Sequence, residues 1–172
     1  MTPKLIVFVD ADHAGDSDNR RSRTGYIYRL EPIGPISWQS SKQELIALSS
    51  AEAEYIALCS ATLYLRELLE EAKLAQLPNF SLFCDNQSAI RIANKNGFAN
   101  RTKHIALRSF FVKDEIEKGR LELPYCPTSE MVADYLTKKL GKPKFEYCML
   151  LTGQSHVTSS DTPEAKGSVG NN

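Results

Sequence analysis

The sequence predicts a single α/β domain. Three features predict this class: an apolar run over residues 5–9 that leads into two carboxylates, a long helical segment that starts at Ser49, and a second apolar strand that ends in Asp85. A chain of 172 residues suffices for one domain with one sizeable core. Acidic and basic residues both number 21, so no overall charge indicates a nucleic-acid partner, and any site for a polyanion must be local.

The first predicted strand covers residues 5–12 and is buried on both faces, because a half-exposed strand would alternate with polar residues. Asp10 stands at its carboxyl end, and Asp12 points to the same side by the two-residue period of a strand. A carboxylate in this position either contributes to a metal site or is simply an aspartate at the start of the loop that follows the strand. This segment alone leaves both readings open.

Two further strands are predicted over residues 24–30 and 36–40, where aromatic and β-branched residues are frequent. The short connection between them, with two prolines and a glycine, favours an antiparallel meander. In the second of these strands we expect Trp38 to be a core anchor rather than a base-stacking platform.

The longest predicted helix runs from Ser49 to about residue 74. Ser49 as N-cap and Glu52 three residues later form a capping box. At 100° per residue, Glu54 lies in the middle of the leucine-rich face, towards the sheet, whereas Glu52 lies on the polar face. An acid among leucines is costly unless a cation or hydrogen bonds compensate it, so Glu54 requires a functional explanation.

The second half of the chain repeats the pattern of a strand that ends in an acid. The strand over residues 80–85 ends in Asp85 and precedes a helical segment at 89–93. Asp85 therefore lies at a strand-to-helix switch, where α/β sheets generally place ligands.

The remaining predicted elements are a helix over about 104–118, a strand over 120–126 and a short helix. Ser129 caps this last helix, which runs to about residue 140 and holds Asp134 on its first turns. We predict a domain over residues 1–140 and a C-terminal extension over 141–172, largely disordered from about 154 because it contains almost nothing to bury.

The four cysteines lie far apart and form no CxxC pair, so we expect reduced core thiols rather than a zinc site or disulfides. No segment approaches the roughly 18 apolar residues of a membrane span, and no secretory signal is present. We therefore expect an intracellular protein, in the cytoplasm or the nucleus.

Four acids from four different elements form the candidate site: Asp10, Glu54, Asp85 and Asp134. Converging carboxylates repel one another, so such a cluster is typical of a Mg²⁺ or Mn²⁺ site. Two such ions about 4 Å apart can activate a water and stabilise the leaving oxygen of a phosphodiester. Spacing alone does not establish convergence, since single acids at strand ends are usually solvated or capping.

A series of sequence blocks extends in order from about residue 5 to residue 140. The blocks are Asp10-Ala-Asp-His-Ala-Gly-Asp16, Arg20-Arg-Ser22, Thr24-Gly-Tyr26, Pro35-Ile-Ser-Trp38, Ser41-Lys-Gln43, Ser49-Ser-Ala-Glu-Ala-Glu-Tyr-Ile-Ala57, Cys84-Asp-Asn-Gln-Ser-Ala89, Thr102-Lys-His-Ile105 and Ala133-Asp-Tyr-Leu-Thr-Lys138. In residues and spacing they resemble the ribonuclease H domain of Ty1/copia-type retrotransposon polyproteins.

The resemblance implies a ribonuclease H-like fold, with a mixed five-stranded sheet in the order 3-2-1-4-5 flanked by helices. It also implies hydrolysis of the RNA strand of RNA–DNA hybrids with two Mg²⁺ or Mn²⁺ ions. Asp10 would bridge both ions, Glu54 and Asp85 would complete one site, and Asp134 the other. A reverse transcriptase polymerase domain is then an expected partner; because Met1 directly precedes the first strand, we expect that domain to be absent from this chain.

Two groups of residues are candidates for substrate binding. Short polar side chains can hydrogen-bond phosphates and the 2′-hydroxyl that distinguishes RNA from DNA; these are Ser22, Thr24, Asn86 and Gln87, of which the last two, beside the Asp85 carboxylate, are preferred. Basic side chains either contact the nucleic-acid backbone or form a solvated face; these are Arg20, Arg21, Arg101 and Lys103.

Several residues depart from the family pattern. His13 replaces the usual tryptophan, and it either touches substrate or a carboxylate or is a surface-loop residue. Ala106 replaces the acid that often follows Lys-His-Ile. The loop before Asp134 lacks the histidine that many cellular ribonucleases H carry; Glu130 either shares its task or, as we favour, is a helix-dipole partner.

Two alternative functions remain. The first is another nuclease of the same fold that acts on DNA, against which the Thr-Gly-Tyr and Ser-Trp blocks argue. The second is a degraded retroelement remnant that keeps the fold and binds nucleic acid or a partner without cleaving. The presence of all four acids disfavours this second alternative.

Overall fold

The computed structural model describes residues 4–71, 73, 79–95 and 103–153, without the side chains of residues 95 and 103–109. In chain order its helices and strands are β1 (Lys4–Asp12), β2 (Arg23–Glu31), β3 (Gly34–Lys42), α1 (Ser50–Glu71), β4 (Phe80–Phe83), α2 (Gln87–Lys95), α3 (Lys103–Glu117), β5 (Leu121–Glu122), α4 (Asp134–Thr137) and α5 (Lys142–Leu151).

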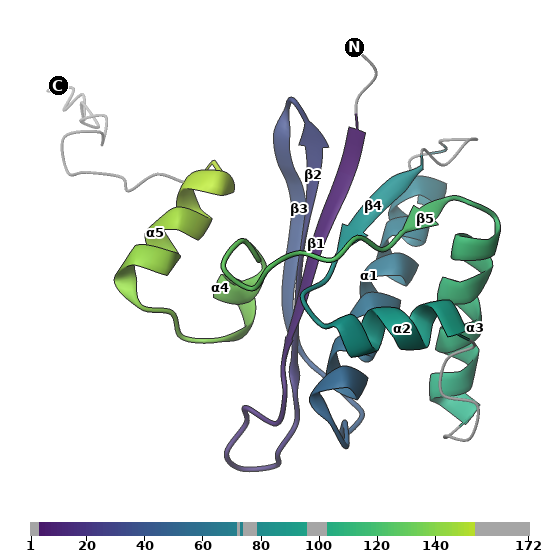
Figure 1. Cartoon of the computed structure of the whole chain (residues 1–172), viewed down its shortest axis with the longest axis horizontal. Coiled ribbons are helices and arrows are strands. Elements are labelled where there is room, and N and C mark those ends of the chain that lie inside the picture. The colour runs from purple at the N-terminus through teal and green to yellow at the C-terminus, as the bar shows by residue number, and fades with distance from the viewer. Residues whose placement is uncertain (1–3, 72, 74–78, 96–102, 154–172) are drawn as a thin grey trace, which may run out of the picture.

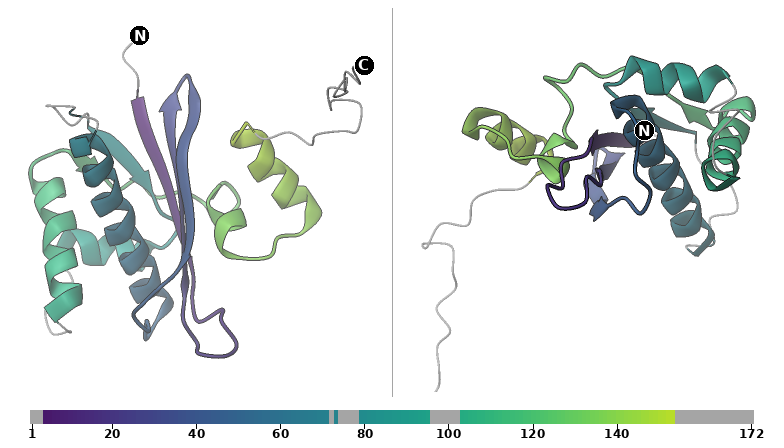
Figure 2. Two further views of the ribbon diagram at one scale, coloured as in Figure 1. Left: turned by 180° about the vertical axis from the view of Figure 1, so that it is seen from behind. Right: turned by 90° about the horizontal axis from the view of Figure 1, so that it is seen from below.

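The strands in this described part of the chain form one five-stranded sheet in the order β3-β2-β1-β4-β5. Strands β1, β2 and β3 pair antiparallel, whereas β4 runs parallel to both β1 and β5. Helices α1, α2 and α3 cover one face of the sheet, and α4 and α5 lie on the other side (Figures 1 and 2). The predicted ribonuclease H-like architecture and its strand order are confirmed.

Strand β1 lies in the middle of the sheet and contacts apolar side chains on both of its faces. Leu5, Val7 and Val9 are at most 3% exposed and belong to the main core, which α1 covers. On the other face Phe8 stacks on Phe83 of β4, with ring centroids 5.2 Å apart. A continuous apolar run thus places Asp10 at the end of a strand that neighbours hold from both sides.

The start of α1 is fixed by side-chain bonds to the backbone. Ser49 Oγ accepts a hydrogen bond from the backbone N–H of Glu52 (3.2 Å), which confirms the predicted N-cap. The Glu52 carboxylate reaches back and accepts a hydrogen bond from the backbone N–H of Leu48 (2.8 Å). The prediction that Glu52 lies on the polar face is wrong, because in this position it is only 2% exposed.

The C-terminal elements are shorter than predicted. Strand β5 has two residues and is followed only by an isolated bridge between Cys84 and Tyr125, since the intervening Pro124 has no N–H to donate to a ladder. Helix α4 begins at Asp134 and not at Ser129, because residues 127–131 form backbone-bonded turns instead. Glu130 is therefore exposed and outside any described helix, and its predicted role as a helix-dipole partner is wrong.

Trp38 is not a core anchor. Its side chain is 58% exposed on β3, which is the edge strand of the sheet. The pattern of residues 36–40 correctly predicts a strand, but a local pattern does not show which strand lies at the edge of the sheet.

The region after residue 140 contains helix α5, which the sequence reading did not predict. The rest of the extension, residues 154–172, for which disorder is predicted, lies outside the described residues. All four cysteines are buried and free, which confirms their expected place in the core. In the described residues no helix combines the length and the apolar character needed to cross a membrane.

Gly25 lets α4 approach the sheet beside Asp10, its partner in the β1–β2 register. A Cβ atom at Gly25 would lie 2.6 Å from Thr137 Cγ2 and 2.9 Å from Leu136 Cβ. We predict that Gly25→Ala lowers the free energy of unfolding by about 1–3 kcal/mol through overpacking, measured by urea denaturation.

The matched control is Gly141→Ala, where a Cβ would have no atom within 4 Å and the backbone has a negative φ. This change should cost less than about 1 kcal/mol, the scale of an N-cap effect. Equal losses in the two variants would contradict the close approach of α4.

Candidate active site

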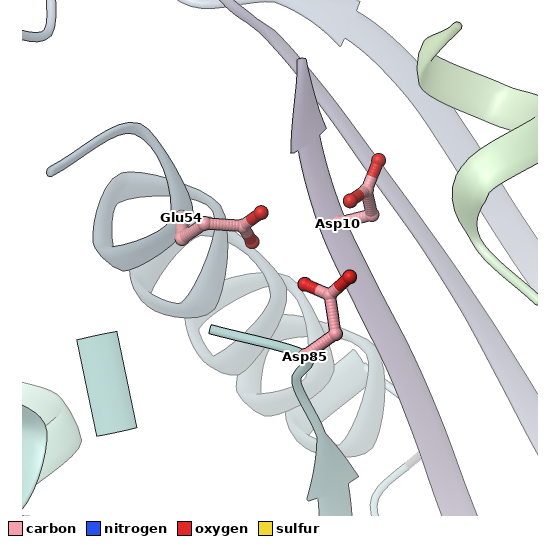
Figure 3. A group of neighbouring side chains, drawn as sticks. All are labelled: Asp10, Glu54 and Asp85. Carbon is pink, nitrogen blue, oxygen red and sulfur yellow. The ribbon is translucent and has the colours of Figure 1, made fainter. Parts of the chain in front are cut away.

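Three of the four predicted acids converge at one end of the sheet. Asp10 comes from β1, Glu54 from α1 and Asp85 from the segment after β4, and one carboxylate oxygen of each lies within 4.8 Å of the others. Figure 3 shows the three carboxylates pointing towards a common space. This is the geometry that the sequence could suggest but not establish.

The topology explains the convergence. Because β1 and β4 are parallel and paired as far as Phe8 and Phe83, Asp10 and Asp85 each follow two residues later at the same end. Glu54 lies early in α1, and its carboxylate accepts a hydrogen bond from the backbone N–H of Ala11. The helix phase that pointed Glu54 towards the sheet is therefore correct.

The cluster holds more negative charge than the surrounding protein compensates. Asp10 is 1% exposed and Glu54 5%. Burial, together with the neighbouring carboxylates of Asp10 and Asp85, raises the pKa of Glu54 to about 9. Burial also raises the pKa of Asp10, although Lys138 and Thr137 oppose this shift. Glu54 Oε2 is buried and has no hydrogen-bond partner in the described structure.

Asp134 lies beside the other three acids and is joined to them through Lys138. The Lys138 ammonium lies 2.9 Å from Asp134 Oδ1 and 3.4 Å from Asp10 Oδ1. Burial opposes the charged form of Lys138, but the two carboxylates outweigh it and raise its pKa. Thr137 adds a hydrogen bond from its hydroxyl to Asp10 Oδ2. Asp134 is thus adjacent to the cluster but is not one of its three mutually close members.

The donor set suits a hard divalent cation. All the ligand atoms offered are carboxylate oxygens, which Mg²⁺ and Mn²⁺ prefer. The buried and unpartnered Glu54 oxygen is the kind of atom that a cation would satisfy. Asp10, Glu54 and Asp85 therefore fit a metal site.

The predicted polar substrate contacts divide into two pairs. Ser22 and Thr24 are at most 2% exposed and accept hydrogen bonds from the backbone N–H of Ala14 and from Gln43 Nε2, so both help to hold the scaffold. Asn86 Oδ1 accepts the N–H groups of Ser88 and Ala89 and caps α2, and Gln87 beside it is exposed. The second pair is the more accessible one.

The predicted basic contacts also differ in placement. Arg20 and Arg21 are exposed, and Arg21 lines a cavity of about 530 Å³ next to the acids. The same cavity is lined by Lys42, Lys138 and Lys139 and by the acids Asp12 and Asp16, of which Asp16 pairs with Lys42. Arg101 lies outside the described residues, and Lys103 is the first residue of α3 with an undescribed side chain.

Thr137, Lys138 and Thr128 were missed as site residues. Lys138 stands four residues after Asp134 in the block Ala133-Asp-Tyr-Leu-Thr-Lys138, and this spacing was the available signal. Thr128 donates to Asp85 Oδ2 (2.7 Å) from a different segment, for which the sequence offers no signal. His13 Nε2 lies 3.2 Å from the carbonyl oxygen of Ala47, which favours a structural role for this histidine.

Sequence relatives of the chain are retrotransposon polyproteins. It is 40% identical over 154 residues to the retrovirus-related Pol polyprotein from transposon TNT 1-94 of Nicotiana tabacum, covering 88% of this chain and 11% of the relative. It is 36% identical over 148 residues to the polyprotein from transposon RE2 of Arabidopsis thaliana, covering 84% and 10%. The chain therefore spans about a tenth of the length of these relatives. No protein-family model matches it.

The fold is also that of solved ribonucleases H. The crystal structure of LC11-RNase H1 in complex with an RNA/DNA hybrid matches with a TM-score of 0.53 and 17% identity, over 78% of this chain and 94% of that one. At this identity the likeness concerns the fold alone.

The pKa of Glu54 predicts a pH dependence of stability without metal. Because the folded state raises this pKa from 4.5 to about 9, the unfolded state loses its proton first as the pH rises. The contribution of Glu54 to the free energy of unfolding is complete below about pH 4.5. It then falls as the pH rises, by no more than about 1.4 kcal/mol per pH unit, until about pH 9.

The measurement is urea denaturation in EDTA over this pH range. Glu54→Gln should become progressively more stable than the wild type as the pH rises, whereas the exposed control Glu44→Gln should follow the wild-type curve. A constant difference between Glu54→Gln and wild type would contradict the prediction.

Proposed function

The chain is a ribonuclease H-fold homologue of Ty1/copia-type retrotransposon Pol polyproteins, and from this premise we propose that it hydrolyses the RNA strand of RNA–DNA hybrids as a metal-dependent endonuclease. The observation that carries the proposal is the convergence of Asp10, Glu54 and Asp85 at the end of β1 and β4. The reaction belongs to reverse transcription of a copia-type element.

Divalent ions would be held by two overlapping sets of acids. Asp10, Glu54 and Asp85 would hold one Mg²⁺ or Mn²⁺ ion, and Asp10 with Asp134 the other. Bound ions of this kind supply an activated water and stabilise the leaving oxygen of a phosphodiester.

The chain's own residues hold these acids in place. The Ala11 N–H orients Glu54, the Thr137 and Thr128 hydroxyls orient Asp10 and Asp85, and Lys138 reduces the repulsion between Asp10 and Asp134. These bonds fix four carboxylates whose mutual repulsion would otherwise drive them apart.

The cavity beside the acids suits a nucleic-acid backbone. Arg21, Lys138 and Lys139 line it, and phosphates would pair with these cations. We assign Arg20 to the same approach. Arg101 and Lys103 stay proposed backbone contacts on the sequence pattern alone.

Recognition of RNA is assigned to the residues after Asp85. Asn86 uses its oxygen to cap α2, and its NH₂ group is the donor for a 2′-hydroxyl, with the exposed Gln87 beside it. Because the chain spans about a tenth of its polyprotein relatives, we assign the polymerase part of such a polyprotein as the partner that helps to hold the hybrid.

The proposal predicts that Asp10→Asn and Glu54→Gln each lower the rate of cutting of a labelled hybrid in Mg²⁺ by at least about 100-fold, since several kcal/mol of transition-state stabilisation depend on the ions. Both variants should remain folded by circular dichroism. Glu44→Gln, at an exposed position, should cut like the wild type.

Two outcomes would contradict the proposal. Equal cutting of duplex DNA would favour a DNA nuclease of the same fold. Tight binding of hybrid without any cutting, in Mg²⁺ and in Mn²⁺, would favour a remnant that no longer cleaves.

The exposed cation Arg21 in this cavity predicts a salt effect on hybrid binding. Arg21→Gln removes one backbone contact, so it should weaken binding and reduce the slope of log K against log salt by about 0.9. Arg66→Gln, in an exposed ion pair with Glu70 on α1, should leave that slope unchanged. Fluorescence anisotropy with a labelled hybrid in Ca²⁺ measures both, and an unchanged slope in Arg21→Gln would remove the cavity from the binding surface.

A further inference from the structure

Helix α5 contacts the segment that leads into Asp134 through one half-buried cation. The ammonium of Lys144 lies 2.8 Å from the carbonyl oxygen of Thr128 and 2.6 Å from that of Ser129. It also lies 3.7 Å from Asp134 Oδ2. The Lys144 side chain is 24% exposed and therefore half-buried, whereas Thr128 and Ser129 are exposed.

The segment that Lys144 holds reaches the acid cluster. Residues 127–131 form tight turns, in which the N–H of Glu130 donates to Pro127 O (2.8 Å) and that of Met131 to Thr128 O (3.3 Å). From this segment the Thr128 hydroxyl donates to Asp85 Oδ2 at 2.7 Å. A continuous path of bonded groups therefore runs from Lys144 through Thr128 to Asp85.

Apolar packing does not explain how the middle of this segment is held. Residues 127–130 are all exposed, whereas Cys126 before them and Met131 after them are buried. Between these two anchors, the bonds to Lys144 join the turn to α5, and the Thr128 hydroxyl joins it to Asp85. Bonds from an ammonium to carbonyl oxygens are stronger than those between neutral groups.

Helix α5 is itself attached firmly enough to act as the support. Cys148 is 0% exposed, and its Sγ lies 4.0 Å from Met131 O. The rings of Phe145 and Tyr135 meet edge to face, with centroids 6.5 Å apart. Lys144 thus extends from a helix that also contacts the end of the turn, at Met131, and the start of α4, at Tyr135.

We infer that Lys144 is a positioning residue of the active site, which from helix α5 holds the turn at residues 127–131 so that Thr128 orients the Asp85 carboxylate. The inference rests on the proposed function, because the role of Asp85 does. Lys144 acts through Thr128 and contacts Asp134 directly, so it supports two acids. The catalytic unit consequently includes α5 and does not end at residue 140.

A double-mutant cycle in the full chain tests the path. Lys144→Met and Thr128→Val should each lower kcat for hybrid cutting by about 10-fold at saturating Mg²⁺, with KM for the hybrid changed less than about twofold. Saturating metal removes the separate effect of the lost charge on ion binding. Because both changes break one path, the double variant should also lose about 10-fold rather than about 100-fold.

Two variants control for charge and helix stability. Lys142→Met removes an 84% exposed lysine of the same helix, which lies 3.8 Å from Glu146, and it should leave kcat unchanged. Lys144→Arg keeps a cation with several donors and should recover most of the lost rate. Independent, multiplicative losses in the double variant, or wild-type kcat in Lys144→Met, would overturn the inference.

A second readout does not depend on cleavage. In the metal-free protein, Lys144→Met should speed hydrogen exchange at the Glu130 and Met131 amides, and Lys142→Met should not. Thr128→Val, which changes no charge, should weaken Mn²⁺ binding several-fold in calorimetry. Unchanged exchange and unchanged Mn²⁺ affinity would overturn the inference, whereas an inactive wild type with these effects present would overturn only the proposed function.

Discussion

The structure depends on keeping several carboxylates together in a place with little water. Asp10 and Glu54 are almost completely buried, and the third acid, Asp85, lies within the same small space. Each of them stands on a rigid element or directly after one, because β1 and β4 are paired and α1 packs across them. An acid on a loose loop would move away from its neighbours, and only a firm scaffold can hold the repelling groups at ligand distance.

The protein lowers the cost of this arrangement with both positive charge and hydrogen bonds. Lys138 is the cation between Asp10 and Asp134, while Thr137, Thr128 and the Ala11 N–H each give one donor to a carboxylate. The raised pKa of Glu54 shows that this compensation is incomplete. If the protein's own groups compensated all of the negative charge, the acids would have little affinity for a cation. The uncompensated negative charge therefore suits these acids to metal binding.

The sequence was sufficient wherever the deciding pattern was local. The apolar run before Asp10, the similar run before Asp85 and the helical phase of Glu54 each follow from short stretches of chain, and all three place their acids correctly. The errors concern what tertiary structure decides. Trp38 lies on an edge strand, Glu52 folds back onto Leu48, and Ser129 gives its carbonyl to Lys144 instead of capping a helix.

Helix α5 shows the same limit for the domain boundary. The boundary at residue 140 was placed where the apolar pattern weakens, and α5 indeed buries little beyond Cys148. Besides an aromatic contact between Phe145 and Tyr135, it is attached through the Lys144 ammonium and two carbonyl oxygens. Hydrophobic periodicity does not register contacts of this kind, because a lysine that binds backbone carbonyls has the same sequence signature as a lysine in solvent. A segment that reads as an appendage can therefore hold part of an active site.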